Sequence, residues 1–63
     1  MPTNWIGTPV EDLVAHYGTP KAIVGSSPSV AIYIYEAGWF YVDTYRGRIR
    51  FWQARRAVLG SPP

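Results

Sequence analysis

The most regular pattern of apolar positions lies near the N-terminus and has the period of a helix. Apolar side chains recur three, four and seven residues along, in the set Val10, Leu13, Val14 and Tyr17. Thr8 precedes this stripe as a candidate N-cap, Glu11 lies three residues later to complete a capping box, and Gly18 follows as a terminator. The pattern predicts a helix over about residues 9–17 with one apolar face.

From residue 30 onward the apolar pattern changes to a period of two. Runs rich in β-branched and aromatic residues cover about residues 30–35, 39–45 and 48–56, and glycine-containing segments separate them. Three such runs joined by short turns predict an antiparallel meander. The composition of residues 53–59 suits either a longer third strand or a helix, and we expect residues 57–63 to form a loose tail.

The segment between the helix and the first of these strands, residues 18–29, has the composition of a connection. Its apolar run at 22–24 suits either a short strand or a buried apolar contact, and residues 25–29 are typical of a loop. We therefore predict a single α+β domain over residues 1–63, with one N-terminal helix packed on a three-stranded antiparallel β-meander.

The register of the sheet decides which side chains share a face. A three-residue first loop with Gly38 as a left-handed bulge, and a two-residue loop at 46–47, would separate aliphatic from amphipathic side chains. One face would then hold Val30, Ile32, Ile34, Phe40, Val42, Thr44, Ile49 and Phe51. The other would hold Ala31, Tyr33, Tyr35, Trp39, Tyr41, Asp43, Tyr45, Arg48, Arg50 and Trp52. Two tight two-residue loops would instead mix the faces.

The composition narrows the chemistry that the chain can perform. A chain of 63 residues without cysteine forms one small core and has neither a disulfide nor a cysteine-based zinc site. Its one histidine, His16, has no second ligand at a recognisable spacing, and its glycines are dispersed rather than gathered into a phosphate-binding loop. We therefore expect no enzyme activity, no catalytic or metal-binding residues, no cofactor and no small-molecule substrate.

The sequence also gives an expected location and an uneven distribution of charge. The N-terminus has no basic and apolar leader, and no apolar run is long enough for a membrane span, so a cytoplasmic location is the default expectation. The formal net charge is only +2, but all five arginines lie between Arg46 and Arg56, with no acidic residue among them. The positive charge is therefore concentrated in one basic segment, and the rest of the chain is mildly acidic.

The second of the two predicted faces combines aromatic side chains with arginines. Tyr, Trp and Arg dominate binding hot spots, and a small monomer rarely leaves so much apolar surface in water. We predict a partner-binding face for a second copy of the chain or for another protein, formed by Tyr33, Tyr35, Trp39, Tyr41, Arg48, Arg50 and Trp52. Two alternatives stay open: the same face binds single-stranded nucleic acid, or the segment Trp5–Ile6 or the C-terminal segment of the chain covers it.

The segment NWIGTPVEDLVAHYGTP, residues 4–20, resembles the start of the SmpA/OmlA-like small domains of bacterial envelope proteins. The Tyr-rich strand and the later YRGRI hairpin extend the resemblance over residues 4–53. The resemblance implies a helix on a three-stranded antiparallel sheet, a role in protein interaction or assembly without catalysis, and an envelope location for a processed or trimmed chain. It assigns no catalytic residue, and it gives Leu13 a place in the core.

Overall fold

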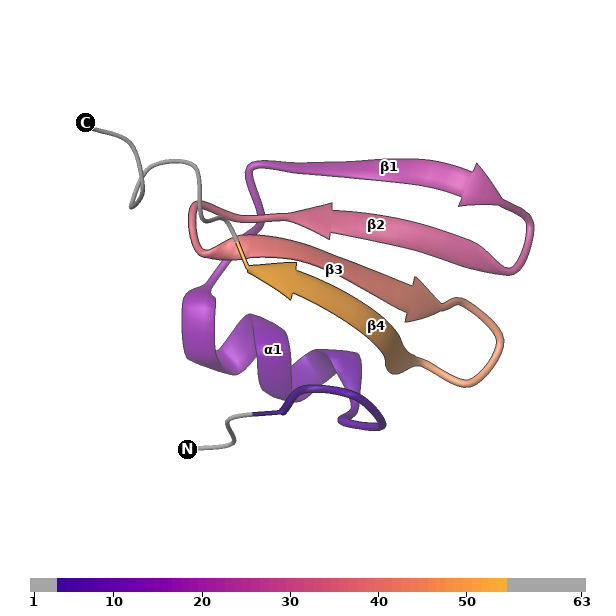
Figure 1. The fold of residues 1–63 in the computed structure, drawn as a ribbon, viewed down its shortest axis with the longest axis horizontal. Coiled ribbons are helices and arrows are strands. Elements are labelled where there is room, and N and C mark those ends of the chain that lie inside the picture. Colours follow the sequence, from indigo (N-terminus) through magenta and orange to yellow (C-terminus); the bar gives the residue numbers. More distant parts are fainter. Residues whose placement is uncertain (1–3, 55–63) are drawn as a thin grey trace.

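The computed structural model describes residues 4–54, which form one helix and a four-stranded antiparallel sheet (Figure 1). The strands lie side by side in chain order, β1-β2-β3-β4. The α+β class and the N-terminal helix are confirmed, but the sheet has four strands where we predicted three. The elements are α1 (Val10–Tyr17), β1 (Ala22–Ser27), β2 (Val30–Ile34), β3 (Gly38–Asp43) and β4 (Arg48–Ala54).

The strand missing from the predicted three-stranded meander is β1, although the pattern left residues 22–24 open as either a short strand or a buried apolar contact. It includes Gly25 and the two serines that we assigned to a loop, so the connection to β2 consists of Pro28 and Ser29 alone. Cross-strand pairing with β2 holds β1 in place, although its second half, from Gly25 to Ser27, has a composition typical of a loop. The Thr44 hydroxyl donates a hydrogen bond to the Pro28 carbonyl oxygen (2.8 Å), which links this turn to the loop between β3 and β4.

The loop between β3 and β4 is longer than predicted, because Asp43 organises it. The Asp43 carboxylate oxygen Oδ1 accepts hydrogen bonds from the backbone N–H groups of Tyr45 (2.9 Å) and Arg46 (3.1 Å), and the Asp43 carbonyl accepts one from Gly47 (2.8 Å). This side-chain turn ends β3 at Asp43 and makes a four-residue loop in place of the predicted two-residue loop. Gly47 takes the positive φ (+69°) that the loop requires.

The loop between β2 and β3 is shorter than predicted. Tyr35 and Gly38 exchange two backbone hydrogen bonds (2.9 and 3.2 Å), so only Glu36 and Ala37 lie in the turn. The predicted three-residue loop is therefore wrong, and β2 is turned over relative to β3. Ile34 pairs with Trp39, on the face where we had placed only amphipathic side chains.

The pairing of β4 also differs from the predicted pattern. A bulge at Arg50 interrupts the pairing of β3 with β4, so Phe51 lies opposite Tyr41 and Trp52 lies opposite Phe40. Phe51 and Trp52 have thereby exchanged the faces on which we predicted them. The described part of β4 ends at Ala54, and the predicted continuation to residue 56 and the tail over 57–63 lie outside the described residues.

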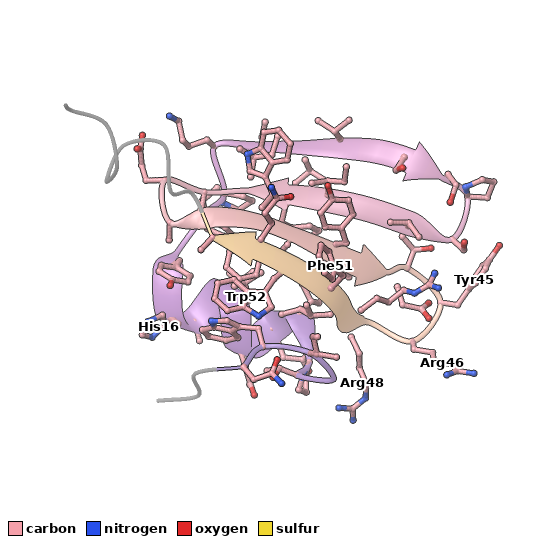
Figure 2. The ribbon with its side chains drawn as sticks, in the orientation of Figure 1. His16, Tyr45, Arg46, Arg48, Phe51 and Trp52 are labelled. Atoms are coloured by element: carbon pink, nitrogen blue, oxygen red, sulfur yellow. The ribbon has the colours of Figure 1, made fainter. Side chains whose placement is uncertain are left out.

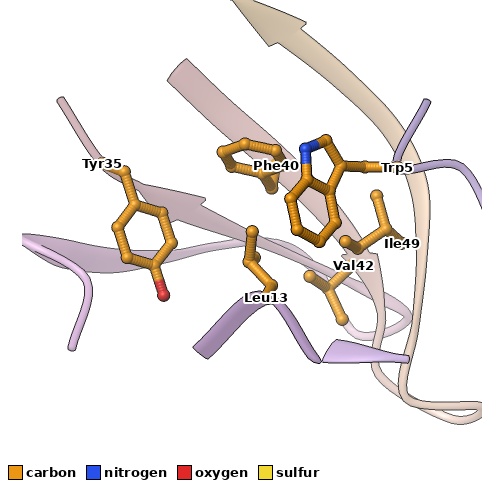
Figure 3. Packing of buried hydrophobic residues seen from close by; sticks show 6 residues of the cluster. All are labelled: Trp5, Leu13, Tyr35, Phe40, Val42 and Ile49. Carbon is orange, nitrogen blue, oxygen red and sulfur yellow. The ribbon is translucent and has the colours of Figure 1, made fainter. Parts of the chain in front are cut away.

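The core lies between α1 and the face of the sheet formed by alternate residues of β3 and β4. Leu13 is the fully buried helix residue of the core (Figure 3). Val10 packs against the same cluster, and the Tyr17 ring contacts the Trp5, Tyr35 and Phe40 rings. This aromatic core contrasts with the aliphatic face that the sequence pattern predicted. The buried side chains are Trp5, Leu13, Tyr35, Phe40, Val42 and Ile49.

The N-terminal segment connects the helix to β4 through backbone hydrogen bonds. Gly7 N–H donates to the Ile49 carbonyl (2.7 Å), and Ile49 N–H donates to the Thr8 carbonyl (2.9 Å). Pro9 precedes the helix as its N-cap residue, and no side chain caps the helix. The predicted capping box at Thr8 and Glu11 is therefore wrong, because the backbone of Thr8 is paired with the sheet instead.

Replacing Gly38 tests the close approach of β3 to β4. The Cβ of an alanine there would collide with the Gln53 carbonyl oxygen and lie 3.1 Å from Cα of Ala54. We expect Gly38→Ala to lower the free energy of unfolding by about 1–3 kcal/mol, measured by urea denaturation, because backbone must move. Gly25→Ala is the control, since its Cβ would meet no atom within 4 Å. Equal losses in the two variants would contradict the β3–β4 geometry.

Candidate functional site

The face of the sheet that points away from α1 carries two rows of cross-strand neighbours. One row runs across all four strands and consists of Val24, Ile32, Tyr41 and Phe51. The row beside it consists of Ala22, Ile34, Trp39 and Gln53. Cross-strand neighbours on one face pack against each other, so each row forms a continuous surface. We call this surface the open face and define it by Val24, Ile32, Ile34, Trp39, Tyr41 and Phe51.

The open face leaves large apolar side chains in contact with solvent. Val24 is 46% exposed, Trp39 is 46% exposed and Phe51 is 53% exposed. The Tyr41 and Phe51 rings meet edge to face at 5.6 Å between centroids. Neither row contains a charged side chain. Apolar area concentrated in this way on so small a domain is typical of an interaction surface.

Charged groups border the open face at its two ends. Lys21, which precedes β1, forms an exposed ion pair with Glu36 in the β2–β3 turn (2.7 Å). At the opposite end, Asp43 pairs across the sheet with Arg48. The apolar rows therefore lie between two polar margins, an arrangement that resembles the core and rim of a protein interface.

The structure divides the seven residues that we predicted as one binding face. Trp39 and Tyr41 lie together on the open face, whereas Tyr33, Tyr35 and Trp52 lie on the face that packs toward α1. The turned-over β2 and the bulge in β4 cause this division. Figure 2 labels Phe51 and Trp52, neighbours in sequence that point to opposite faces of the sheet.

Tyr33, Tyr35 and Trp52, the three predicted site residues on the helix side, lie next to the core or to the end of α1. Trp52 stacks on Phe40 with 5.7 Å between ring centroids and 4° between ring planes. The buried Tyr35 hydroxyl donates a hydrogen bond to the Gly18 carbonyl oxygen (2.8 Å), which ties the end of α1 to the sheet. Burial raises the pKa of Tyr35 above its ordinary value, and the neighbouring Tyr33 raises it further.

The predicted site arginines lie at the β3–β4 end of the sheet and not among the aromatic rows. Arg48 donates a hydrogen bond through Nη1 to the Gly7 carbonyl oxygen (2.8 Å), and Arg50 is exposed at the bulge. Backbone N–H groups of Arg46 and Tyr45, together with the positive charges of Arg46 and Arg50, hold the pKa of the Asp43 carboxyl below its ordinary value. The residue opposite Asp43 in β4 is Arg48.

Sequence reasoning missed most of the open face. Val24 lies in the unpredicted strand, and Ile32, Ile34 and Phe51 were assigned to the core because they are aliphatic or follow an alternating pattern. Trp5, a candidate to cover the exposed aromatic residues, is instead buried in the core on the helix side. The two arrangements differ in the length of the β2–β3 turn, and the sequence at Glu36 and Ala37 is compatible with both lengths.

The described part of the chain also bears on metal binding and on membrane insertion. Residues 4–54 contain no group of three or more His, Cys, Asp or Glu side chains that could hold a metal ion. His16 is exposed, and its ring lies 4.5 Å from that of Tyr17 and 5.6 Å from that of Trp5. Within the same range, no helix is long and apolar enough to cross a membrane.

Comparison with known proteins found no matching protein-family model, no matching curated protein and no matching solved structure. The resemblance to the SmpA/OmlA-like domains therefore stays a prediction that rests on the sequence motif of residues 4–20. The four-stranded sheet also differs from the three-stranded sheet that this resemblance implied.

Proposed function

We propose that the protein is a non-enzymatic assembly module that forms a homodimer by packing its open face against the open face of a second copy. The observation that carries this proposal is the pair of uncharged rows across four strands, with Val24, Trp39 and Phe51 each about half exposed. Antiparallel sheets commonly pack face to face in this way, with interdigitating side chains between them.

The absence of charge on the open face favours a second copy as its occupant. A partner must present a neutral, apolar and nearly flat surface to match these rows, because an unpaired charge buried against them would be costly. The chain itself carries such a surface, and a two-fold axis would set each row against an identical surface. The polar margins, with Lys21 and Glu36 at one end and Asp43 and Arg48 at the other, would form the rim.

The small core gives a second argument for self-association. Within residues 4–54, one eight-residue helix covers one face of the sheet, and only six side chains are buried. Domains of this size bury little of their surface and often gain stability by association. A sheet-on-sheet dimer would add the open-face side chains to the buried set of both copies.

Nucleic-acid binding by the open face has less support than self-association. Single-stranded nucleic acids require cationic groups near the stacking platform, to follow the phosphate backbone. Neither row contains an arginine or a lysine, and Arg48 and Arg50 lie beyond the end of the rows.

Two neighbouring residues of β1 provide a matched test of the dimer. Val24 and Ile23 have similar exposure (46% and 55%) on the same strand, but Val24 lies on the open face and Ile23 pairs with Tyr33 on the helix side. Light scattering after size exclusion should give the wild-type chain a mass near twice 7.1 kDa. We expect Val24→Glu to be monomeric, because the dimer would bury the added charge, and Ile23→Glu to remain dimeric.

Three outcomes would contradict the proposal. The wild-type chain could remain monomeric at the highest concentration measured, as it would if its own C-terminal segment covered the open face. Val24→Glu could remain dimeric, which would place the interface elsewhere. Ile23→Glu could dissociate as fully as Val24→Glu, which would indicate pairing along β1 itself rather than through the face.

A further inference from the structure

The arginines of β4 and its preceding loop surround a hollow that the open face does not include. The hollow has a volume of about 670 Å³ and lies where the β3–β4 loop meets the N-terminal segment. This volume is within the usual range of small-ligand sites. Figure 2 labels Tyr45, Arg46 and Arg48 at this end of the sheet. Its lining includes Ile6, Asp43, Tyr45, Arg46, Arg48 and Arg50.

The charge of the hollow is strongly positive for its size. Three guanidinium groups line it against a single carboxylate, that of Asp43. Oδ1 of this carboxylate already accepts two backbone N–H groups of the turn. Among residues 4–54, no carboxylate lies within ion-pair distance of these arginines, and Arg48 directs only one of its donors to Gly7. The remaining N–H donors are available to a phosphate group, which arginine binds in a planar, two-pronged geometry.

An exposed aromatic ring lies beside these charges. Tyr45 is 78% exposed at the tip of the loop, and within residues 4–54 its ring contacts no other ring. Ile6, which is also more than half exposed, adds a second apolar side chain to the lining. An aromatic platform next to arginine side chains suits a ligand that carries both a base and a phosphate.

We propose that this hollow binds the phosphodiester backbone of a single-stranded nucleic acid, with one base stacked on Tyr45. The site differs from the face that the sequence alone suggested, because the arginines and the exposed tyrosine converge on the loop and not on the aromatic rows. None of the six residues that define the open face lines the hollow, whereas Asp43 and Arg48 belong both to the hollow and to the polar margin of the open face. Variants at Arg46, Arg50 and Tyr45 therefore test the hollow separately from the homodimer.

The test uses fluorescence anisotropy of a labelled oligothymidylate titrated with the full chain at several salt concentrations. Each phosphate contact should contribute about −0.7 to the slope of log affinity against log salt concentration. We expect Arg46→Ala and Arg50→Ala each to weaken binding and to make the slope shallower by about 0.7. Lys21→Ala removes the same charge at the opposite end of the sheet, so it should leave affinity and slope nearly unchanged.

Substitutions of Tyr45 test the stacked base separately from the phosphate. Tyr45→Ala should weaken binding about 5- to 150-fold with no change in the salt slope, because it removes stacking and no charge. Tyr45→Phe keeps the ring and should bind like the wild-type chain. Arg46, Arg50 and Tyr45 are exposed, so these variants should unfold at the wild-type temperature.

The nucleic-acid proposal fails if the labelled strand does not bind at low salt. It also fails if Lys21→Ala loses as much affinity as Arg50→Ala, which would indicate attraction to net charge alone. Displacement of the strand by an equal concentration of inorganic phosphate, with Tyr45→Ala binding normally, would indicate a simple phosphate site and would overturn the assignment to nucleic acid. Val24→Glu should bind the strand like the wild-type chain, so the two proposals can fail separately.

Discussion

Phe40→Ala is expected to lower the free energy of unfolding by about 3–5 kcal/mol, which is most or all of the stability of a domain this small. Phe40 is fully buried, and its ring lies within 6 Å, between centroids, of the rings of Trp5, Tyr35 and Trp52. Truncation would remove the common neighbour of these rings and leave a cavity that they cannot fill. Urea denaturation followed by tryptophan fluorescence measures the loss.

Phe51→Ala is the matched control, because it deletes the same atoms from a half-exposed position on the open face. In the Val24→Glu background, where we expect a monomer, its cost should be about 1 kcal/mol, since the ring is already half in water. The assignment of the two faces would be wrong if Phe51→Ala cost as much as Phe40→Ala. A variant of Phe40 that does not fold would agree with the prediction, provided that Phe51→Ala folds.

Leu13→Ala is expected to cost about 2–5 kcal/mol and to lower the melting temperature by more than about 10 °C. Leu13 is fully buried, and it is the one helix residue in the core cluster. Its loss would open a cavity between α1 and the sheet. Thermal unfolding followed by circular dichroism measures the effect.

The control for this change is Val14→Ala, one residue along the same helix. Val14 is 38% exposed, and alanine is a better helix former, so the two effects should nearly cancel. A melting temperature that stays unchanged in Leu13→Ala, or that falls equally in Val14→Ala, would mean that another face of α1 packs on the sheet.

Local chemistry determined the features that could be predicted from the sequence. The apolar spacing around Leu13 and the glycine at position 18 specify the helix and its end, and Gly18 N–H bonds to the Val14 carbonyl (2.7 Å) as a terminator should. The alternating runs likewise specify three of the strands. Each of these signals is contained in a few consecutive residues.

The features that could not be predicted depend on competition between turns. The sequence at Glu36 and Ala37 is compatible with loops of two or three residues, and the difference of one residue turns β2 over. The bulge at Arg50 exchanges Phe51 and Trp52 in the same way, and both rings are apolar enough for either face. The serines of β1 form a strand only because β2 lies beside them. These two differences divide the predicted binding face between the two sides of the sheet.

The two edge strands of the sheet, β1 and β4, differ in how easily another strand could pair with them, because the N-terminal segment lies along β4. Pro9 bridges to Arg48, and the backbone of Gly7 and Thr8 is already paired with Ile49, so an incoming chain finds the start of β4 occupied. Within residues 4–54, β1 lies at the other edge with no further strand beside it, and no residue from Ala22 to Ser27 is charged or proline. If two chains joined edge to edge through β1, the β1 edge of each chain would then be occupied, and the start of each β4 would already be paired with its own N-terminal segment. Such a contact would end at a pair of chains instead of growing into a fibre.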